Sequence, residues 1–144
     1  GKANVRQGAS GGGLELGSGV TVEGTWHNLK IEGHPDTANP GAGLTVPDGQ
    51  EGLELAARCY DLTGLGYLGV DLVMDAEHGP MMLELNARPG LNIQIAMDDG
   101  LLRRCQIVEK QLEALKDETR PVAERVAFAK QQFAVAGPVP AEEE

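Results

Sequence analysis

Three oxygen-bearing side chains lie on two neighbouring apolar runs near the middle of this chain. Asp71 belongs to the run from Tyr67 to Asp75, and Glu84 and Asn86 belong to the run from Met81 to Asn86. Both runs are rich in β-branched and large apolar residues, which predicts two strands. Carboxylate and amide oxygens are the ligands that Mg²⁺ prefers in proteins. The residue types therefore raise the question of whether the fold brings them together.

The answer depends on the turn between the two strands. If residues 76–79 form a four-residue turn, Asp75 pairs with Pro80 and Asp71 lies directly opposite Glu84. Directly opposed residues point to the same side of a sheet, with Cβ atoms roughly 4.5–5.5 Å apart. Two carboxylates at that separation repel each other unless a cation lies between them. This register predicts a divalent metal site.

Alternation along the second strand adds further expectations. Met82, Glu84 and Asn86 share one face, whereas strict alternation puts Leu83 on the other. An ordinary solvated face of a half-exposed hairpin would also explain the two acids. The segment Arg88-Pro89-Gly90 favours the metal site, because a cation and a rigid turn follow the proposed ligands closely.

Two stretches carry a resemblance to a known family. GVDLVMDAEHGPMMLELNARPG (69–90) resembles the metal-binding core of ATP-grasp enzymes, and is most similar to the alpha-L-glutamate ligase-like (RimK-related) branch. KANVRQGAS (2–10) is similar to the family's phosphate-flanking segment, basic-x-Asn-Val-x-x-Gly-Gly. The resemblance runs from Lys2 to about Leu101. It implies that Asp71, Glu84 and Asn86 hold two Mg²⁺ ions, or Mn²⁺, against the phosphates of ATP.

The resemblance also implies roles for five further residues. Lys2 would stabilise the transferring phosphoryl group, Asn4 would position it, and Arg6 would lie beside the phosphates. Leu83 would pack against adenine, and Arg88 would hold either a phosphate or the substrate carboxylate. Alternatively, Arg88 forms a surface ion pair without a catalytic role, and such pairs contribute little to folding stability.

The implied activity is that of an ATP-dependent carboxylate–amine ligase. ATP phosphorylates a carboxylate, and an amine, such as that of glutamate or another amino acid, displaces phosphate to leave an amide. Two other classes stay open: a non-catalytic module that binds a partner, and a phosphotransferase on the same fold, since a fold alone does not choose the acceptor. At 144 residues, the chain is expected to be the C-terminal lobe of a longer protein, with the lobe at 1–136 and an acidic disordered tail at 137–144.

The composition limits which classes of partner the protein can bind and indicates the cellular compartment in which it works. The formal net charge of −10 argues against nucleic-acid binding, which needs a basic face. No apolar run approaches the length of a membrane span. Cys59 and Cys105 lack metal or disulfide spacing, so they predict buried thiols in a reducing compartment, the cytoplasm. Apolar stripes on the C-terminal helices leave room for a homo-oligomer.

The pattern as a whole predicts an α+β fold, with one antiparallel sheet backed by helices. The expected strands are 2–6, 14–26, 67–75 and 81–86, and the expected helices are 49–62, 100–116 and 120–133. Asp48 and Glu51 fit a capping box at the first helix. The glycine-rich stretch at 8–13 favours a flexible turn, with anion binding beside Lys2 and Arg6 as the second interpretation. The literal GxGxxG at 64–69 follows a helix and opens a strand, so it lacks the context of a dinucleotide-binding motif.

Overall fold

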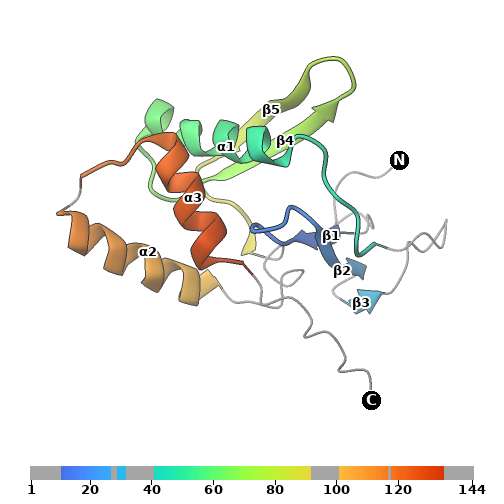
Figure 1. Ribbon diagram of the computed structural model, residues 1–144, viewed down its shortest axis with the longest axis horizontal. Coiled ribbons are helices and arrows are strands. Elements are labelled where there is room, and N and C mark those ends of the chain that lie inside the picture. The colour runs from blue at the N-terminus through green and yellow to red at the C-terminus, as the bar shows by residue number, and fades with distance from the viewer. Residues whose placement is uncertain (1–10, 27–28, 32–40, 92–100, 117, 135–144) are drawn as a thin grey trace.

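The fold combines short antiparallel hairpins with three helices. The computed structural model describes residues 11–26, 29–31, 41–91, 101–116 and 118–134. The helices are α1 (Gly49–Thr63), α2 (Leu101–Leu115) and α3 (Val122–Gln132), and the strands are β1 (Gly11–Leu14), β2 (Thr21–Trp26), β3 (Leu29–Ile31), β4 (Gly69–Asp75) and β5 (Gly79–Asn86) (Figure 1). The α+β class and the three helices are confirmed. The strand expected at 2–6 lies outside the described residues.

The described strands form two sheets rather than the single predicted one. Strands β1, β2 and β3 make one antiparallel sheet, and β4 and β5 make the other. Among the described residues, each strand pairing joins strands that are neighbours in sequence. The glycines at 11–13, predicted as part of a turn, belong to β1 instead, because their backbone pairs with β2.

Helix α1 begins and ends at residues in the left-handed region. Asp48 has φ 49° and makes no side-chain capping hydrogen bond, so the predicted capping box is wrong. An N-cap side chain reaches the first-turn amides from an extended backbone, which Asp48 does not have. Gly64 ends the helix with φ 68°, and its N–H donates to the Tyr60 carbonyl at 2.7 Å. That geometry is a common helix stop for glycine.

Helix α1 covers one face of the β4–β5 hairpin. Gly52 is buried, and a Cβ added there would lie 3.7 Å from Cδ1 of Leu72 and 3.8 Å from Cβ of Pro80. Pro80 is buried and Leu72 is half-buried. A glycine at this position lets the helix approach the strands closely.

Helix α3 packs on the other side of α1 through Arg125. Its guanidinium donates to the Ala57 carbonyl at 3.0 Å and to both carboxylate oxygens of Asp61 at 2.7 and 2.6 Å. The guanidinium also lies 5.4 Å from the centre of the Tyr60 ring. A planar fork that binds a carboxylate and stacks on an aromatic ring is a contact that lysine cannot reproduce.

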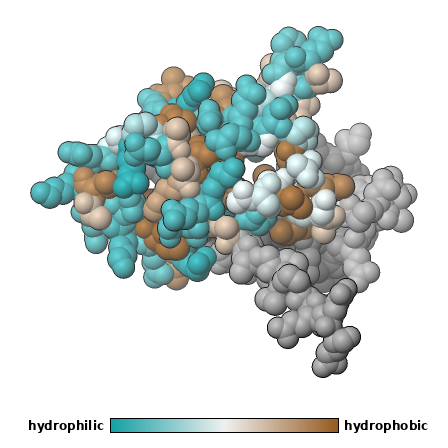
Figure 2. Space-filling view, in the orientation of Figure 1, coloured by the Kyte–Doolittle hydropathy of each residue, from teal (hydrophilic) through white to brown (hydrophobic). Residues whose placement is uncertain are grey.

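The helices enclose a wide groove. A hollow of about 630 Å³ lies between α1, α2, α3 and the loop at 64–68, and it is lined mainly by apolar side chains. Helix α2 buries none of its side chains. Figure 2 shows apolar side chains gathered over the helices, while the projecting end of the β4–β5 hairpin is mostly hydrophilic. No helix among the described residues is long and apolar enough to cross a membrane.

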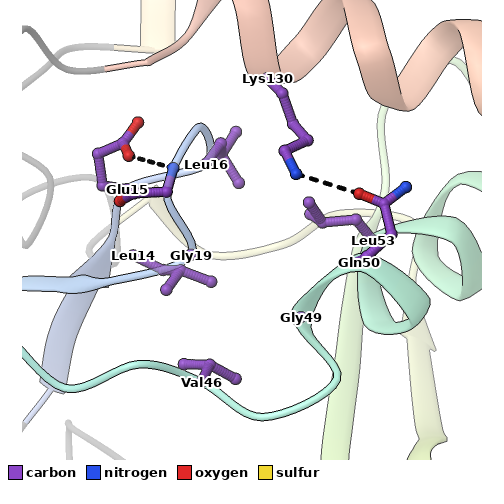
Figure 3. A pocket seen from close by; sticks show the side chains of 10 residues that line it. Leu14, Glu15, Leu16, Gly19, Val46, Gly49, Gln50, Leu53 and Lys130 are labelled. Atoms are coloured by element: carbon purple, nitrogen blue, oxygen red, sulfur yellow. Dashed lines mark hydrogen bonds between the residues drawn. The ribbon is translucent and has the colours of Figure 1, made fainter.

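A smaller cavity lies where the first hairpin meets the helices. It has a volume of about 110 Å³ and is lined by Leu14 and Leu16 from the hairpin and Leu53 from α1 (Figure 3). Lys130 of α3 donates to Oε1 of Gln50 of α1 at 3.1 Å beside it. The first hairpin thus lies close to α1, the helix that also contacts β5.

Candidate functional site

The hairpin turn is one residue shorter than the sequence predicts. Asp75 pairs with Gly79, which leaves residues 76–78 as a three-residue turn. One carboxylate oxygen of Asp75 accepts the N–H groups of Glu77 and His78, both at 3.0 Å, and lies 2.8 Å from Nδ1 of His78. Gly79 follows with φ 69°. A glycine in the left-handed region commonly closes a three-residue hairpin loop.

A β-bulge restores the predicted register at the acids. Beyond the turn, the ladder continues regularly to the pair Leu72 and Met82, and the next pair is Asp71 and Glu84. Leu83 is the extra residue of the bulge, because two residues of β5 here oppose one of β4. The prediction that Asp71 lies directly opposite Glu84 is confirmed, although it was derived with a different turn.

The bulge changes which side chains share the open face. Met82 pairs with Leu72, whose neighbour Asp71 pairs with Glu84. Because consecutive residues of β4 point to opposite sides, Met82 and Glu84 do so too, and the predicted common face is wrong for Met82. Leu83 is 68% exposed, so helix α1 does not cover it. Strict alternation, which placed Leu83 away from Glu84, fails where the bulge interrupts it.

The open face presents oxygen ligands with few competing partners. Asp71, Glu84 and Asn86 are all exposed, and Nδ2 of Asn86 donates to Oε1 of Glu84 at 3.1 Å. This contact leaves the amide oxygen of Asn86 available as an acceptor. Within the described segments, the Asp71 carboxylate makes no hydrogen bond or ion pair. Two carboxylates and an amide oxygen are hard donors that suit a Mg²⁺ ion shared with a phosphate ligand.

This donor set has limits that bear on its chemistry. No group of three histidine, cysteine or acidic side chains comes together among the described residues. A metal here would have at most two carboxylates from these residues, so further ligands must come from elsewhere, which is typical of Mg²⁺ bound with nucleotide phosphates. Three hollows among the described residues are lined by other side chains, and the acids lie on an open surface instead of the common cavity that a metal site suggests.

The base of the hairpin is closely packed beside the acids. Gly69 pairs with Asn86, and a Cβ added to Gly69 would lie 2.8 Å from Cβ of Pro89 and 3.4 Å from Cβ of Asn86. Pro89 therefore lies directly against the strand, and its rigid ring fixes the exit of the chain after Arg88. Arg88 is exposed. The bend brings a cation to the same end of the hairpin as Asn86.

Two features of this site escaped prediction, and one set of residues lies outside the described chain. Leu83 gives no sign of a bulge in its residue type, whereas Gly79 offers one, because a glycine after three turn residues permits positive φ. Lys2, Asn4 and Arg6, which the resemblance places beside the phosphates, fall outside the residues that the structure describes.

The comparisons with known proteins identify the family. Searches of curated proteins and of solved structures gave no significant match. A family model described as sugar-transfer associated ATP-grasp matches residues 1–110, which include the entire hairpin. The match supports the ATP-grasp superfamily and its ATP-binding role, but not the alpha-L-glutamate ligase-like branch. With most of its length matched, the chain belongs to the sugar-transfer associated ATP-grasp family.

Proposed function

We propose that this chain serves an ATP- and Mg²⁺-dependent ligase that joins a carboxylate to an amine. The observation that carries the proposal is the pairing of Asp71 with Glu84 on an open face, with Asn86 bonded to Glu84. In the reaction, a carboxylate oxygen of the substrate attacks the γ-phosphorus of ATP, and the bond to ADP breaks. The amine nitrogen then attacks the acyl phosphate carbon, phosphate leaves, and the nitrogen loses a proton.

The residues of the open face would act mainly through charge. Phosphoryl transfer depends on positioning and on neutralising the phosphate oxygens, with little covalent help from the protein. Bound Mg²⁺ supplies that neutralisation, and Asp71, Glu84 and Asn86 are the residues that would hold it. Their carboxylates repel each other until a cation is bound, which favours metal-loaded nucleotide over free nucleotide.

Other residues complete the proposed site. We assign Lys2 to the transferring phosphoryl group, Asn4 and Arg6 to the phosphates, and Arg88 to a phosphate or the substrate carboxylate. Leu83 would pack against the adenine base, and the bulge supports this role because Leu83 stays exposed beside Glu84.

The family description narrows the substrate class. It speaks of association with sugar transfer, so we propose that the carboxylate or the amine belongs to a sugar-bearing molecule. The donors of the hairpin would hold the nucleotide and the metal, so the sugar-bearing substrate would bind elsewhere.

The proposal is tested by comparing variants of three acids in the same hairpin. In the full-length protein, Asp71→Asn and Glu84→Gln should each lower Mg²⁺-dependent ATP turnover by roughly a hundredfold or more, as loss of comparable electrostatic stabilisation does. Glu77→Gln is the matched control, since Glu77 is exposed at the turn and its carboxylate makes no hydrogen bond or ion pair with the described residues. Calorimetry should show that only the two site variants lose the Mg²⁺-dependent part of ATP binding. A Glu84→Gln protein that binds Mg–ATP as tightly as the wild type would contradict the proposal.

A further inference from the structure

The two halves of the β4–β5 hairpin follow different registers. At the base, Asp71 pairs with Glu84. Toward the turn, Val73 pairs with Met81, one residue out of step with the base. Leu83 lies between the halves as the extra residue of the bulge, and this extra residue accounts for the one-residue shift in register. The tip can therefore change register without moving the pair of acids.

A regular hairpin would give the same pairing at the base. With a four-residue turn and no bulge, Asp71 would still lie opposite Glu84, but Leu83 would pair with Leu72. Leu72 faces α1 beside Gly52, where an added Cβ would lie 3.7 Å from its Cδ1, and paired residues point to the same side. Leu83 would then face the helix, and Met82 would take its place on the open face. The register of the tip decides which of these two side chains lies beside the acids.

Gly79 selects between the two registers. Its φ of 69° lies in the left-handed region, where glycine is free of the steric cost that a Cβ brings. A Cβ added there would still have room, since its nearest neighbours are carboxylate oxygens of Asp48 at 3.8 Å and Glu51 at 3.9 Å. Only the backbone conformation opposes a larger residue, so the short turn depends on a residue that tolerates positive φ.

We propose that Gly79 is a positioning residue that keeps Leu83 on the open face through the three-residue turn and the bulge. Gly79 acts from the far end of the hairpin, four residue pairs or about 13 Å from Asp71. The inference rests on the proposed function, in which Leu83 packs against the nucleotide base. It adds a determinant of base recognition that touches neither the nucleotide nor the metal.

The test measures the strand register by nuclear magnetic resonance and the binding affinity for two ligands, one with a nucleotide base and one without. In Gly79→Ala, nuclear Overhauser contacts from Val73 should move from Met81 to Met82, as the four-residue turn requires. Met82 would then lie opposite Val73, farther from Glu84 than Leu83 does now, so affinity for Mg–ATP should fall roughly tenfold, the effect of losing one apolar contact. Affinity for Mg–tripolyphosphate, which has no base, should stay unchanged because Asp71 still faces Glu84.

Two control variants separate the register from other effects. Gly79→Asn should keep the wild-type contacts and affinities, since asparagine tolerates the left-handed region better than alanine. Gly66→Ala should change neither, because Gly66 has open space around it and no positive φ.

Each outcome bears on a separate claim. The inference is overturned if Gly79→Ala keeps the Val73–Met81 contacts, or if the register moves while the affinity for Mg–ATP does not. A wild-type protein that binds neither ligand would instead contradict the proposed metal site and the base contact. The contacts of Val73 would still decide whether Gly79 sets the register.

Discussion

The β1–β2 and β4–β5 hairpins share a turn acid that binds backbone N–H groups, but among their described residues only β4–β5 also pairs two acids across its strands. In the first, the Glu15 carboxylate accepts the N–H groups of Gly17 at 2.7 Å and Ser18 at 2.5 Å. In the second, Asp75 accepts two turn N–H groups in the same manner. Each hairpin also contains a register shift. An acid at the start of a tight turn is thus explained by the turn itself.

Asp71 and Glu84 have no such explanation. They lie inside the ladder of the second hairpin, away from any turn, and no backbone N–H of the described chain donates to either carboxylate. Like charges directly opposite each other destabilise a sheet. The comparison shows how to separate the two kinds of acid: a carboxylate that satisfies local backbone groups stabilises the fold, and a facing pair without them points to a ligand.

The largest expected effect is a difference in stability between two glycine-to-alanine variants, one in each hairpin. Gly69→Ala should lower the free energy of unfolding by roughly 1–3 kcal/mol, because its Cβ would meet the rigid ring of Pro89 at 2.8 Å. Gly17→Ala should cost less, although its Cβ would lie 3.0 Å from both the Ala134 methyl group and a Glu15 oxygen. The Glu15 carboxylate is the end of a flexible side chain and can move. Urea unfolding of both variants makes the comparison, and equal losses would show that the second hairpin is not the more tightly packed.

A smaller effect is expected from the turn acid of the second hairpin at low pH. The N–H of Glu77, the His78 side chain and the N–H of His78 lower the pKa of Asp75 below its ordinary value. The unfolded chain therefore takes up this proton first, and the stability that Asp75 contributes above roughly pH 4 is lost as the pH falls further. Asp75→Asn should flatten this acid limb slightly, because the carboxylate is exposed. Urea unfolding over that pH range would reveal it, and an unchanged slope would remove Asp75 as a contributor.

The sequence correctly predicted that Asp71 pairs with Glu84, but it did not predict the turn length or the bulge that produce this pairing. Alternating apolar residues specify which face of a strand is covered, and the half-buried pair Val70 and Leu85 lies on the face opposite to that of Asp71 and Glu84. The turn length depends on a left-handed backbone at Gly79, which the sequence permits but does not require. The bulge at Leu83 follows from that turn, so the common face predicted for Met82 was wrong.

For the helices too, the sequence pattern predicted the elements but not the backbone conformation at their ends. Their apolar spacing predicted all three to within about two residues at each end, the usual uncertainty of helix boundaries. The capping box failed because the residue types at Asp48 and Glu51 fit while the backbone at Asp48 does not. The single sheet failed because strand patterns carry no information about which hairpins join.

The central claim is that the open-face pair binds the metal of Mg–ATP and the turn acids do not. Mn²⁺ is a paramagnetic substitute for Mg²⁺ that broadens nearby amide resonances. In a titration of the isotope-labelled protein with Mn²⁺ and ATP, the account predicts early broadening at Asp71, Glu84 and Asn86, with Glu15 and Asp75 affected last. Asp71→Asn should abolish the early broadening. Broadening that begins at Glu15 or Asp75, or that survives in Asp71→Asn, would contradict the account.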